Sequence, residues 1–578
     1  MTDSTLFLAG NTPDAPRSDL PEFLRALAAD MRAVDYTLDG VARLLGQSAY
    51  NALNRDQIIP ALLATESAAQ GAPATAALAA VVRLWLLAEP QTRATLDAAL
   101  PGIRADGLVE LGLLEPVPGA GPSGADLSRT ELMQAKADLR PYGWDANDDG
   151  SGGAELWVAS DLAAHQQAGM LRHDHVLGIG QASTTLVQTT VRRHVAKALD
   201  LGTGCGIQSF HLLHHAEHVT ATDISERALA FARFNLLLNA AALHLDPERL
   251  EDRVSLRRGS LLDPVAGEEF ELVVSNPPFV ITPRTSGEEA SGQFTYRDGG
   301  LPGDEIVSSL VRALPSVLAP AGTAQLLGNW EIPAGAAWAE RPQSWASPDV
   351  DAWFIQREQV SPEQYAETWL QDASESRDRQ HYRDAYAAYL ADFASRNVVG
   401  IGFGMIWLRR PAAGRNLAGS AAPGPDTAGS DTAGSDAARI SRFEEITYPI
   451  EQPVGPHLGA AVERADWLAS NNLVEAHLLV ADDVTEERHQ RPGAEHPGVI
   501  LLRQGAGLRR TNLLSTELAG FVSACDGDLS VGQIIGALAA LLGGSLAGED
   551  GFDDDAFRAG LLTEVGNLVR DGFLLPAR

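Results

Sequence analysis

Two short segments of this chain hold residues whose types and spacing could support chemistry. The first is the glycine-rich run DLGTGCG at 200–206, and the second is NPPF at 276–279. A glycine-rich loop lets the backbone approach a ligand closely, and an asparagine followed by two prolines offers oxygen acceptors on a stiff turn. The two segments can serve one reaction only if the fold brings them to one site. The strands and helices expected around them therefore decide which reaction is possible.

The glycine-rich run is expected to connect a short apolar strand at 198–201 with a helix at 207–215. Nucleotides bind at such places, where a helix N-terminus meets the carboxyl end of a parallel strand. The glycines Gly202, Gly204 and Gly206 have the spacing GxGxG, whereas dinucleotide-binding folds use GxGxxG. This spacing suits the methionyl and ribose parts of S-adenosylmethionine better than a pyrophosphate.

An acid and a later loop complete the predicted cofactor site. A second strand is expected at 219–223, and it ends in Asp223, whose carboxylate can accept hydrogen bonds from both ribose hydroxyls. A third strand-like run precedes 259–261, where we expect Ser260 and Leu261 to border the adenine. The alternative is a glycine-rich turn with a surface acid, which leaves the order of strand, glycines, acid and NPPF unexplained.

The NPPF segment follows a strand expected at 270–275, which places it beside the predicted cofactor loop. A conjugated NH2 group is a weak nucleophile, so both of its N–H bonds must be held for the lone pair to face a methyl carbon. The side-chain oxygen of Asn276 and the carbonyl oxygen of Pro277 can each accept one N–H, and Phe279 can lie flat against the planar group. Positioning and polarisation then supply most of the catalysis, and no strong general base is expected.

These motifs resemble the "methyltransferase small" group of class I methyltransferases. That group includes the HemK/PrmC release-factor glutamine methyltransferases, their eukaryotic and archaeal relatives, and ribosomal-RNA guanine N2-methyltransferases. The resemblance covers roughly 175–330 and continues past NPPF into GGLPGDE at 299–305. It implies a Rossmann-like α/β sheet with S-adenosylmethionine as the methyl donor. The contacts it implies are Asp200, Gly202, Gly204, Asp223 and Ser260 for the cofactor, and Asn276 and Pro277 for the acceptor.

The chain is long enough for several domains, since 578 residues exceed what one core supports. We expect an α/β methyltransferase sheet flanked by two smaller domains. The expected parts are a helical or winged-helix-like domain at 1–115, a β-rich connector at 116–165, the methyltransferase domain at 166–412, a disordered insertion at 413–440, and a winged-helix-like domain at 456–578.

Two of these expectations depend on local patterns. The first domain is expected to end in a polar turn at 104–107 and a strand at 108–114, as a winged-helix wing begins; a plain helical bundle is the alternative. The segment 413–440 is rich in Gly, Ala, Ser and Asp and cannot bury apolar surface. We therefore expect it at the tip of a hairpin whose strands are 398–408 and 441–450, the latter completing the methyltransferase sheet.

Composition argues against several classes of protein. The formal net charge is -32, a poor footprint for binding a phosphate backbone. The two cysteines, Cys205 and Cys525, imply no disulfide framework. The start of the chain shows no secretory signal, and the most apolar run, 74–88, is too short to span a bilayer, so a cytoplasmic enzyme is expected. No metal is expected, because no Cys or carboxylate joins the four histidines of one expected helical face, which are His211, His214, His215 and His218.

The methyl acceptor stays open at this point. The leading hypothesis is a glutamine amide of a translation-factor-like protein. A base in nucleic acid (guanine N2 or adenine N6) is the rival, which the net charge disfavours but the basic residues Arg253, Arg257 and Arg258 keep open. A small molecule is a third candidate, with the aromatic-rich insertion 360–396 either as a lid or as a helical pair on the sheet edge. A cofactor-binding scaffold without activity is a fourth.

Overall fold

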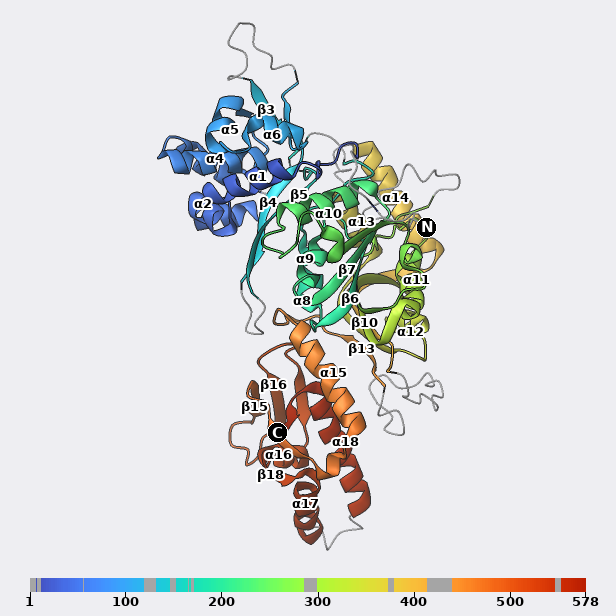
Figure 1. Ribbon diagram of the computed structural model, residues 1–578. Helices are drawn as coiled ribbons and strands as arrows, with labels where there is room; N and C mark the ends of the chain where they lie inside the picture. The colour runs from blue at the N-terminus through green and yellow to red at the C-terminus, as the bar shows by residue number, and fades with distance from the viewer. Residues whose placement is uncertain are drawn as a thin grey trace. The chain divides into compact units, whose positions relative to one another are not determined.

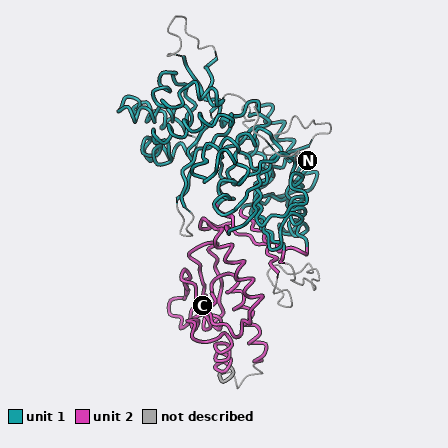
Figure 2. Tube along the Cα trace, in the orientation of Figure 1, with its two compact units in different colours: residues 1–187, 194–347, 358–410 teal, residues 188–193, 348–357, 411–578 magenta. Residues whose placement is uncertain are grey.

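The computed structural model describes most of the chain in two compact units (Figures 1 and 2). The described residues are 7, 12–55, 57–118, 131–145, 152–164, 166–167, 171–284, 299–372, 379–412, 439–545 and 553–577. Unit 1 comprises Met1–Val187, His194–Ser347 and Glu358–Arg410, and unit 2 comprises Gln188–Arg193, Pro348–Arg357 and Pro411–Arg578. The predicted insertion at 413–440 falls almost wholly outside the described residues.

The N-terminal part of unit 1 is helical. Its helices are α1 (Pro21–Ala33), α2 (Leu38–Leu53), α3 (Ile59–Ala69), α4 (Pro73–Trp85), α5 (Arg93–Ala99) and α6 (Arg104–Glu110). A small antiparallel sheet, ordered β1-β3-β2, consists of β1 (Gln91–Thr92), β2 (Leu114–Pro116) and β3 (Leu132–Ala135). The turn expected at 104–107 and the strand expected at 108–114 are wrong, because Ala105 and Leu108 are buried at helical spacing on α6.

A largely parallel sheet that includes one antiparallel strand lies at the centre of unit 1. Its strands are β6 (Val195–Leu201), β7 (Ala216–Asp223), β8 (Val254–Arg258), β9 (Phe270–Ser275), β10 (Leu318–Pro333) and β12 (Val398–Arg409). They are ordered β12-β10-β9-β6-β7-β8, and only β12 runs antiparallel to its neighbour β10. The chain reverses its direction of progression across the sheet between β6 and β9. In open α/β sheets ligands bind at the carboxyl ends of the strands at such a point.

Helices cover both faces of this sheet, with α9 and α10 on one face and α11 and α12 on the other (Figure 1). The helices are α8 (Gln181–Thr189), α9 (Ile207–Leu212), α10 (Glu226–Leu238), α11 (Glu305–Ala313), α12 (Glu340–Trp345), α13 (Pro362–Asp372) and α14 (Arg379–Ser395). Ser225 caps α10 by accepting a hydrogen bond from the Ala228 N–H. The insertion 360–396 is thus a helical pair, and α13 and α14 share a core with Val280 and Ile281.

The connector before the sheet contains an antiparallel hairpin of β4 (Asp138–Trp144) and β5 (Ala154–Ser160). Asn235 of α10 and Asn239, which follows the last residue of that helix, bind the backbone of β5 as a neighbouring strand would. The Oδ1 atoms of Asn235 and Asn239 accept from the N–H groups of Ala159 (2.7 Å) and Trp157 (2.9 Å). Their Nδ2 atoms donate back to the carbonyls of the same two residues. The hairpin is therefore fixed to the methyltransferase sheet through one face of α10.

Unit 2 has a core of its own, in which Phe521, Val565 and Phe573 are fully buried and Cys525 is buried beside them. Its helices are α15 (Gly455–Ser470), α16 (Thr516–Ser523), α17 (Val531–Ser545) and α18 (Asp554–Asp571). Its sheets, ordered β18-β14-β19 and β15-β16-β17, consist of β14 (His477–Val480), β15 (Val484–His489), β16 (Val499–Gln504), β17 (Thr511–Leu514), β18 (Asp526–Ser530) and β19 (Leu574–Pro576). No helix among the described residues is long and apolar enough to cross a bilayer.

The hairpin expected between 398–408 and 441–450 is wrong. The later strand, β13 (Ser441–Glu445), pairs in parallel with β11 (Asp351–Val360). Side-chain complementarity explains this choice of partner: Phe443 stacks on Phe354 with ring centroids 5.1 Å apart, and Glu444 accepts a hydrogen bond from the Trp353 indole. Strand propensity alone located the strand at about the right residues but could not identify its neighbour.

Candidate active site

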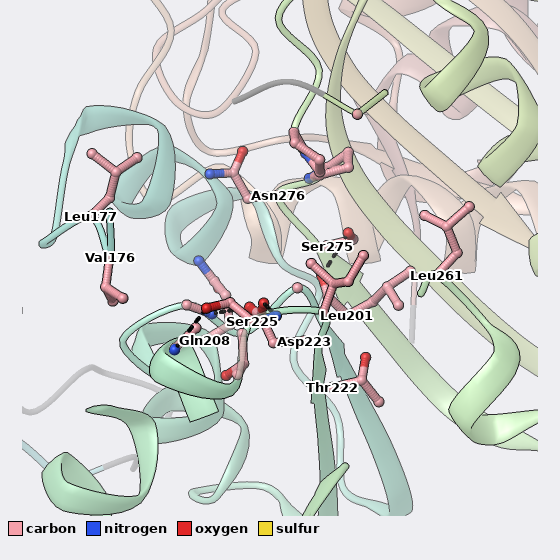
Figure 3. A pocket seen from close by; sticks show the side chains of 18 of the residues that line it. Val176, Leu177, Leu201, Gln208, Thr222, Asp223, Ser225, Leu261, Ser275 and Asn276 are labelled. Atoms are coloured by element: carbon pink, nitrogen blue, oxygen red, sulfur yellow. Dashed lines mark hydrogen bonds between the residues drawn. The ribbon is translucent and has the colours of Figure 1, made fainter. Parts of the chain in front are cut away.

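The carboxyl ends of β6, β7 and β9 open onto a cavity of about 460 Å³ (Figure 3). Small-molecule sites in proteins commonly span about 300–1,000 Å³. The segments that contribute most to its lining are His175–Gly178, Leu201–Cys205, Thr222–Ser225, Gly259–Leu261, Ser275–Pro278 and Gly299–Leu301. The glycine loop and the NPPF segment, both singled out in the sequence, thus meet at one cavity.

The three glycines of the loop differ in what they do. Gly202, Gly204 and Gly206 all have positive φ, at 76°, 55° and 95°. A Cβ at Gly202 or Gly204 would project into open space, and both residues line the cavity, so these two glycines leave room for a ligand. Gly206 precedes α9 and is not among the lining residues, and a Cβ there would lie 3.3 Å from the Phe210 ring. Gly206 therefore shapes the helix start.

Asp200 lies behind the loop and is not among the residues that line the cavity. Its Oδ2 accepts hydrogen bonds from the Thr203 hydroxyl (2.7 Å), the Ser209 hydroxyl (2.7 Å) and the Ser209 N–H (3.0 Å). Burial raises the pKa of Asp200 to about 6, against the lowering effect of these hydrogen bonds. These hydrogen bonds make Asp200 a support of the loop, and a direct contact of this residue with the cofactor stays a prediction.

Asp223 lies at the end of β7 and lines the cavity. Its Oδ2 accepts from the Gly204 N–H (3.0 Å), and its Oδ1 accepts from the Ser225 N–H (2.8 Å). Burial raises the pKa of Asp223, and the backbone hydrogen bonds oppose that shift. Each carboxylate oxygen keeps further acceptor capacity after one hydrogen bond. Asp223 can therefore hold the glycine loop and still accept from two hydroxyls of a ligand.

The loop after β8 forms another wall of the cavity. Ser260 and Leu261 both line it, and Leu261 adopts the left-handed φ of 47°. The backbone of Asp223 fixes this loop, because the Gly259 N–H donates to the Asp223 carbonyl at 3.0 Å. The loop and the β7 carboxylate are thus parts of one assembly, as expected for the two ends of a nucleoside.

Asn276, Pro277 and Pro278 line the same cavity. The Oδ1 atom of Asn276 is buried and accepts no hydrogen bond from the described residues. A buried acceptor without a partner costs about 1–3 kcal/mol, so this atom indicates a ligand that donates an N–H or O–H group. Phe279 is not among the lining residues; its ring meets the Trp369 ring of α13 edge to face at 6.4 Å. Stacking of Phe279 on an acceptor stays a prediction.

The segment His175–Gly178, which sequence reasoning missed, forms part of the wall (Figure 3). Arg227 on α10 holds it in place with a side chain that is only 8% exposed. Its guanidinium donates to the Asp161 carboxylate (2.7 Å) and to the Asp174 carbonyl (2.7 Å), and Asp161 in turn accepts from the Val176 N–H (2.8 Å).

The histidines expected on one helical face do not share a helix, because α9 ends at Leu212 and His218 lies in β7. No group of His, Cys, Asp or Glu that could hold a metal ion occurs within the described part of the chain. The basic cluster is largely engaged within the protein. Arg253 donates to backbone carbonyls such as that of Glu217, Arg257 pairs with Glu268, and Arg258 pairs with Glu226.

Comparison with known proteins gives a family match to the segment around the cavity. Residues 162–291 match the methyltransferase small domain, and residues 33–123 match a domain of unknown function (DUF7059). A ribosomal protein uL3 glutamine methyltransferase of Bradyrhizobium diazoefficiens is 31% identical over 162 residues, which are 27% of this chain and 46% of that protein. A release factor glutamine methyltransferase of Geobacter sulfurreducens is 32% identical over 178 residues, 29% of this chain and 56% of that protein. The chain spans about half the length of these curated relatives.

Solved structures with weak similarity include a methyltransferase from Pyrococcus furiosus (15% identity, TM-score 0.22, 39% of this chain and 81% of that one). A methyltransferase from Thiobacillus denitrificans with bound S-adenosylhomocysteine has 16% identity and a TM-score of 0.21, over 40% and 91% of the two chains. Such scores carry no argument, so the fold assignment rests on the sheet order and the family match.

These findings define a class I methyltransferase domain built on a Rossmann-like sheet, which confirms the α/β fold expected for this segment. More particularly, 162–291 matches the methyltransferase small domain, and the resemblance to release-factor glutamine methyltransferases is confirmed over that segment. S-adenosylmethionine fits the cavity: open space at Gly202 and Gly204 admits it, and the Asp223 carboxylate can accept from its ribose.

Proposed function

We propose that this protein transfers a methyl group from S-adenosylmethionine to the side-chain amide nitrogen of a glutamine in a protein substrate. The observation that carries the proposal is the Oδ1 of Asn276, which is buried on the wall of the cofactor cavity and has no hydrogen-bond partner among the described residues. The names of the relatives support a substrate from the translation machinery, such as a ribosomal protein or a release factor. Such a substrate implies action in the cytoplasm.

Each residue of the site has a defined task in this proposal. S-adenosylmethionine, when bound, supplies a methyl carbon on a sulfonium sulfur, which keeps the bonding electron pair as the carbon leaves. Gly202, Gly204 and Asp223 hold the donor side, with Ser260 and Leu261 beside the adenine. Asn276 Oδ1 and the Pro277 carbonyl accept the two N–H bonds of the amide, which orients the nitrogen lone pair. The nitrogen gains one N–C bond and releases one proton.

The amino group of a nucleic-acid base could donate the same two N–H bonds, but the charge of this protein disfavours nucleic acid as a substrate. A formal net charge of -32 opposes a phosphate backbone. The arginines near the site bond to the protein itself, as Arg257 does to Glu268 and Arg258 to Glu226. A protein substrate, which can contribute cationic side chains, suits this chain better.

The first test replaces Asn276 by alanine. We expect N276A to lose methyl transfer, because the amide would no longer be oriented, while its calorimetric affinity for S-adenosylmethionine stays within a few fold of the wild type. The control is N51A, which removes an exposed asparagine of α2. Equal loss of transfer and donor affinity in N276A would contradict the assigned role.

The second arm of this test identifies the substrate class. The protein is incubated with methyl-labelled S-adenosylmethionine and a cell lysate, and the product is divided between protease and nuclease. Label removed by protease alone supports a protein acceptor. Label removed by nuclease alone would overturn the glutamine proposal in favour of a base, and label that neither treatment moves would indicate a small molecule.

A further inference from the structure

The clamp, residues 276–279, is tethered at both of its ends. Upstream, Ser275 pairs with Leu201 and Leu326 in the sheet, and its hydroxyl donates to the Leu201 carbonyl at 2.8 Å. Downstream, the Ile281 N–H donates to the hydroxyl of Tyr365 on α13 at 2.8 Å. The sheet therefore fixes one end of the clamp, and a side chain of the helical insertion fixes the other.

Packing holds the ring of Tyr365 independently of its hydroxyl. The residue is fully buried, and its ring stacks on Phe403 of β12 with centroids 5.7 Å apart and planes 20° apart. Phe393 of α14 meets it edge to face at 5.5 Å. The hydroxyl also accepts a hydrogen bond from Asn329 Nδ2 of β10 at 2.9 Å. Contacts from β12 and α14 to the ring, and from β10 to the hydroxyl, thus hold the oxygen that accepts from Ile281 in place.

The same helix contacts the clamp at a second point. Trp369 lies one turn beyond Tyr365 on α13, so the two side chains share a helix face. The Trp369 ring meets the Phe279 ring at 6.4 Å and 77°. Helix α13 therefore touches both the last residue of the clamp and the backbone two residues further on.

We propose that Tyr365 is a positioning residue for methyl transfer. Its hydroxyl fixes the backbone at Ile281, and the two prolines of the clamp, which restrict φ, transmit that position to Asn276 Oδ1 and the Pro277 carbonyl. A shift of about 1 Å in a positioning group can slow a reaction by about a hundredfold. The inference rests on the function proposed above and extends it to a helix outside the segment that matches the methyltransferase small domain.

The test replaces Tyr365 by phenylalanine, which keeps the ring and removes only the hydroxyl. We expect Y365F to lower kcat by between about tenfold and about a hundredfold, with the KM and calorimetric affinity for S-adenosylmethionine unchanged. The matched control is Y386F on α14, whose hydroxyl donates to the exposed Glu367. It should leave kcat unaltered. Should Y365F fail to fold, N329A, which leaves the Tyr365 ring in place, is measured in the same way.

Hydrogen exchange gives a readout that needs no substrate. In Y365F the peptide 276–284 should exchange faster, while a peptide over 198–212 in the glycine loop should not change. Unaltered exchange at 276–284 would overturn the inference even if the wild type proved to have no methyl-transfer activity, which would refute only the proposed function. A parallel fall in kcat, donor affinity and melting temperature would also overturn it, since that pattern indicates a general structural role.

Discussion

The two carboxylates near the glycine loop, Asp200 and Asp223, have different tasks although both lie close to the carboxyl end of a strand. Asp200 directs one oxygen at Thr203 and Ser209 and is not among the residues that line the cavity. Asp223 binds the loop backbone and also lines the cavity. The difference follows from position, because Asp200 lies within its strand and Asp223 is the last residue of its own.

This difference leads to a prediction for Asp223. Replacing it by alanine should weaken binding of S-adenosylmethionine by about 1–3 kcal/mol, because the ribose hydroxyls lose a charged acceptor. Burial raises the pKa of Asp223, so protonation begins at a higher pH than for an exposed aspartate, and affinity should fall as pH drops through that pKa. Calorimetry across pH measures both effects. E226A, which removes an exposed acid of α10, is the control, and equal affinities in the two variants would exclude Asp223 from the site.

At the scale of elements, α10 connects the N-terminal hairpin to the cofactor loop. Asn235 and Asn239 both bond to β5, but among the described residues only Asn235 also bonds to the loop, as its Nδ2 donates to the Cys205 carbonyl at 2.9 Å. One amide group therefore joins the hairpin to the loop that faces the donor. Asn239 is a natural comparison, because it bonds to the hairpin at Trp157 and shows no bond to the loop among the described residues.

From this we expect N235A and N239A to differ in one measurement. Both should lower the free energy of unfolding by about 1–3 kcal/mol, since each leaves buried backbone groups of β5 without a partner. Only N235A should also weaken binding of S-adenosylmethionine, because it releases the Cys205 carbonyl. Denaturant unfolding and calorimetry provide the two measurements. Equal donor affinity in both variants would show that the loop holds its shape without Asn235.

Sequence reasoning succeeded where the determinants are local. The strand, the glycines, Asp223 and NPPF each have a short-range pattern, and the structure brings them to one cavity. Sequence reasoning failed where contacts between residues far apart in the sequence determine the structure. Arg227 and Tyr365 act through partners far away in sequence, and β13 found a parallel neighbour through Phe443 and Glu444. The helix α6 was missed because Gly107 suggests a turn, although the apolar residues beside it repeat at helical spacing.

At the scale of the whole molecule, the C-terminal core is local in sequence. Within the described part of the chain, its cluster of apolar side chains draws only on residues from Trp467 to Leu574. A half-buried ion pair joins β13 to this region, with the Arg510 guanidinium on both oxygens of Glu444. Burial alone would raise the pKa of Glu444, but the hydrogen bond from Arg510 and the charges of Arg442 and Arg510 lower it overall.

We therefore expect the fragment 439–578 to unfold in one cooperative transition when it is expressed alone. Within it, E444Q should lower the free energy of unfolding by about 1.5–3 kcal/mol, because Arg510 loses a charged acceptor. Urea unfolding followed by circular dichroism measures both. The control is E486Q on the exposed strand β15. A broad, non-cooperative transition in the unmodified fragment would show that its core depends on the rest of the chain.

The two buried thiols can report local unfolding of the two units. Cys205 belongs to unit 1 and Cys525 to unit 2, and burial raises the pKa of each to about 12, so neither is a reactive thiolate in the native state. An alkylating reagent would modify each sulfur only when its surroundings separate. Mass spectrometry of the two cysteine peptides would then time the loosening of either unit, without a label being introduced anywhere.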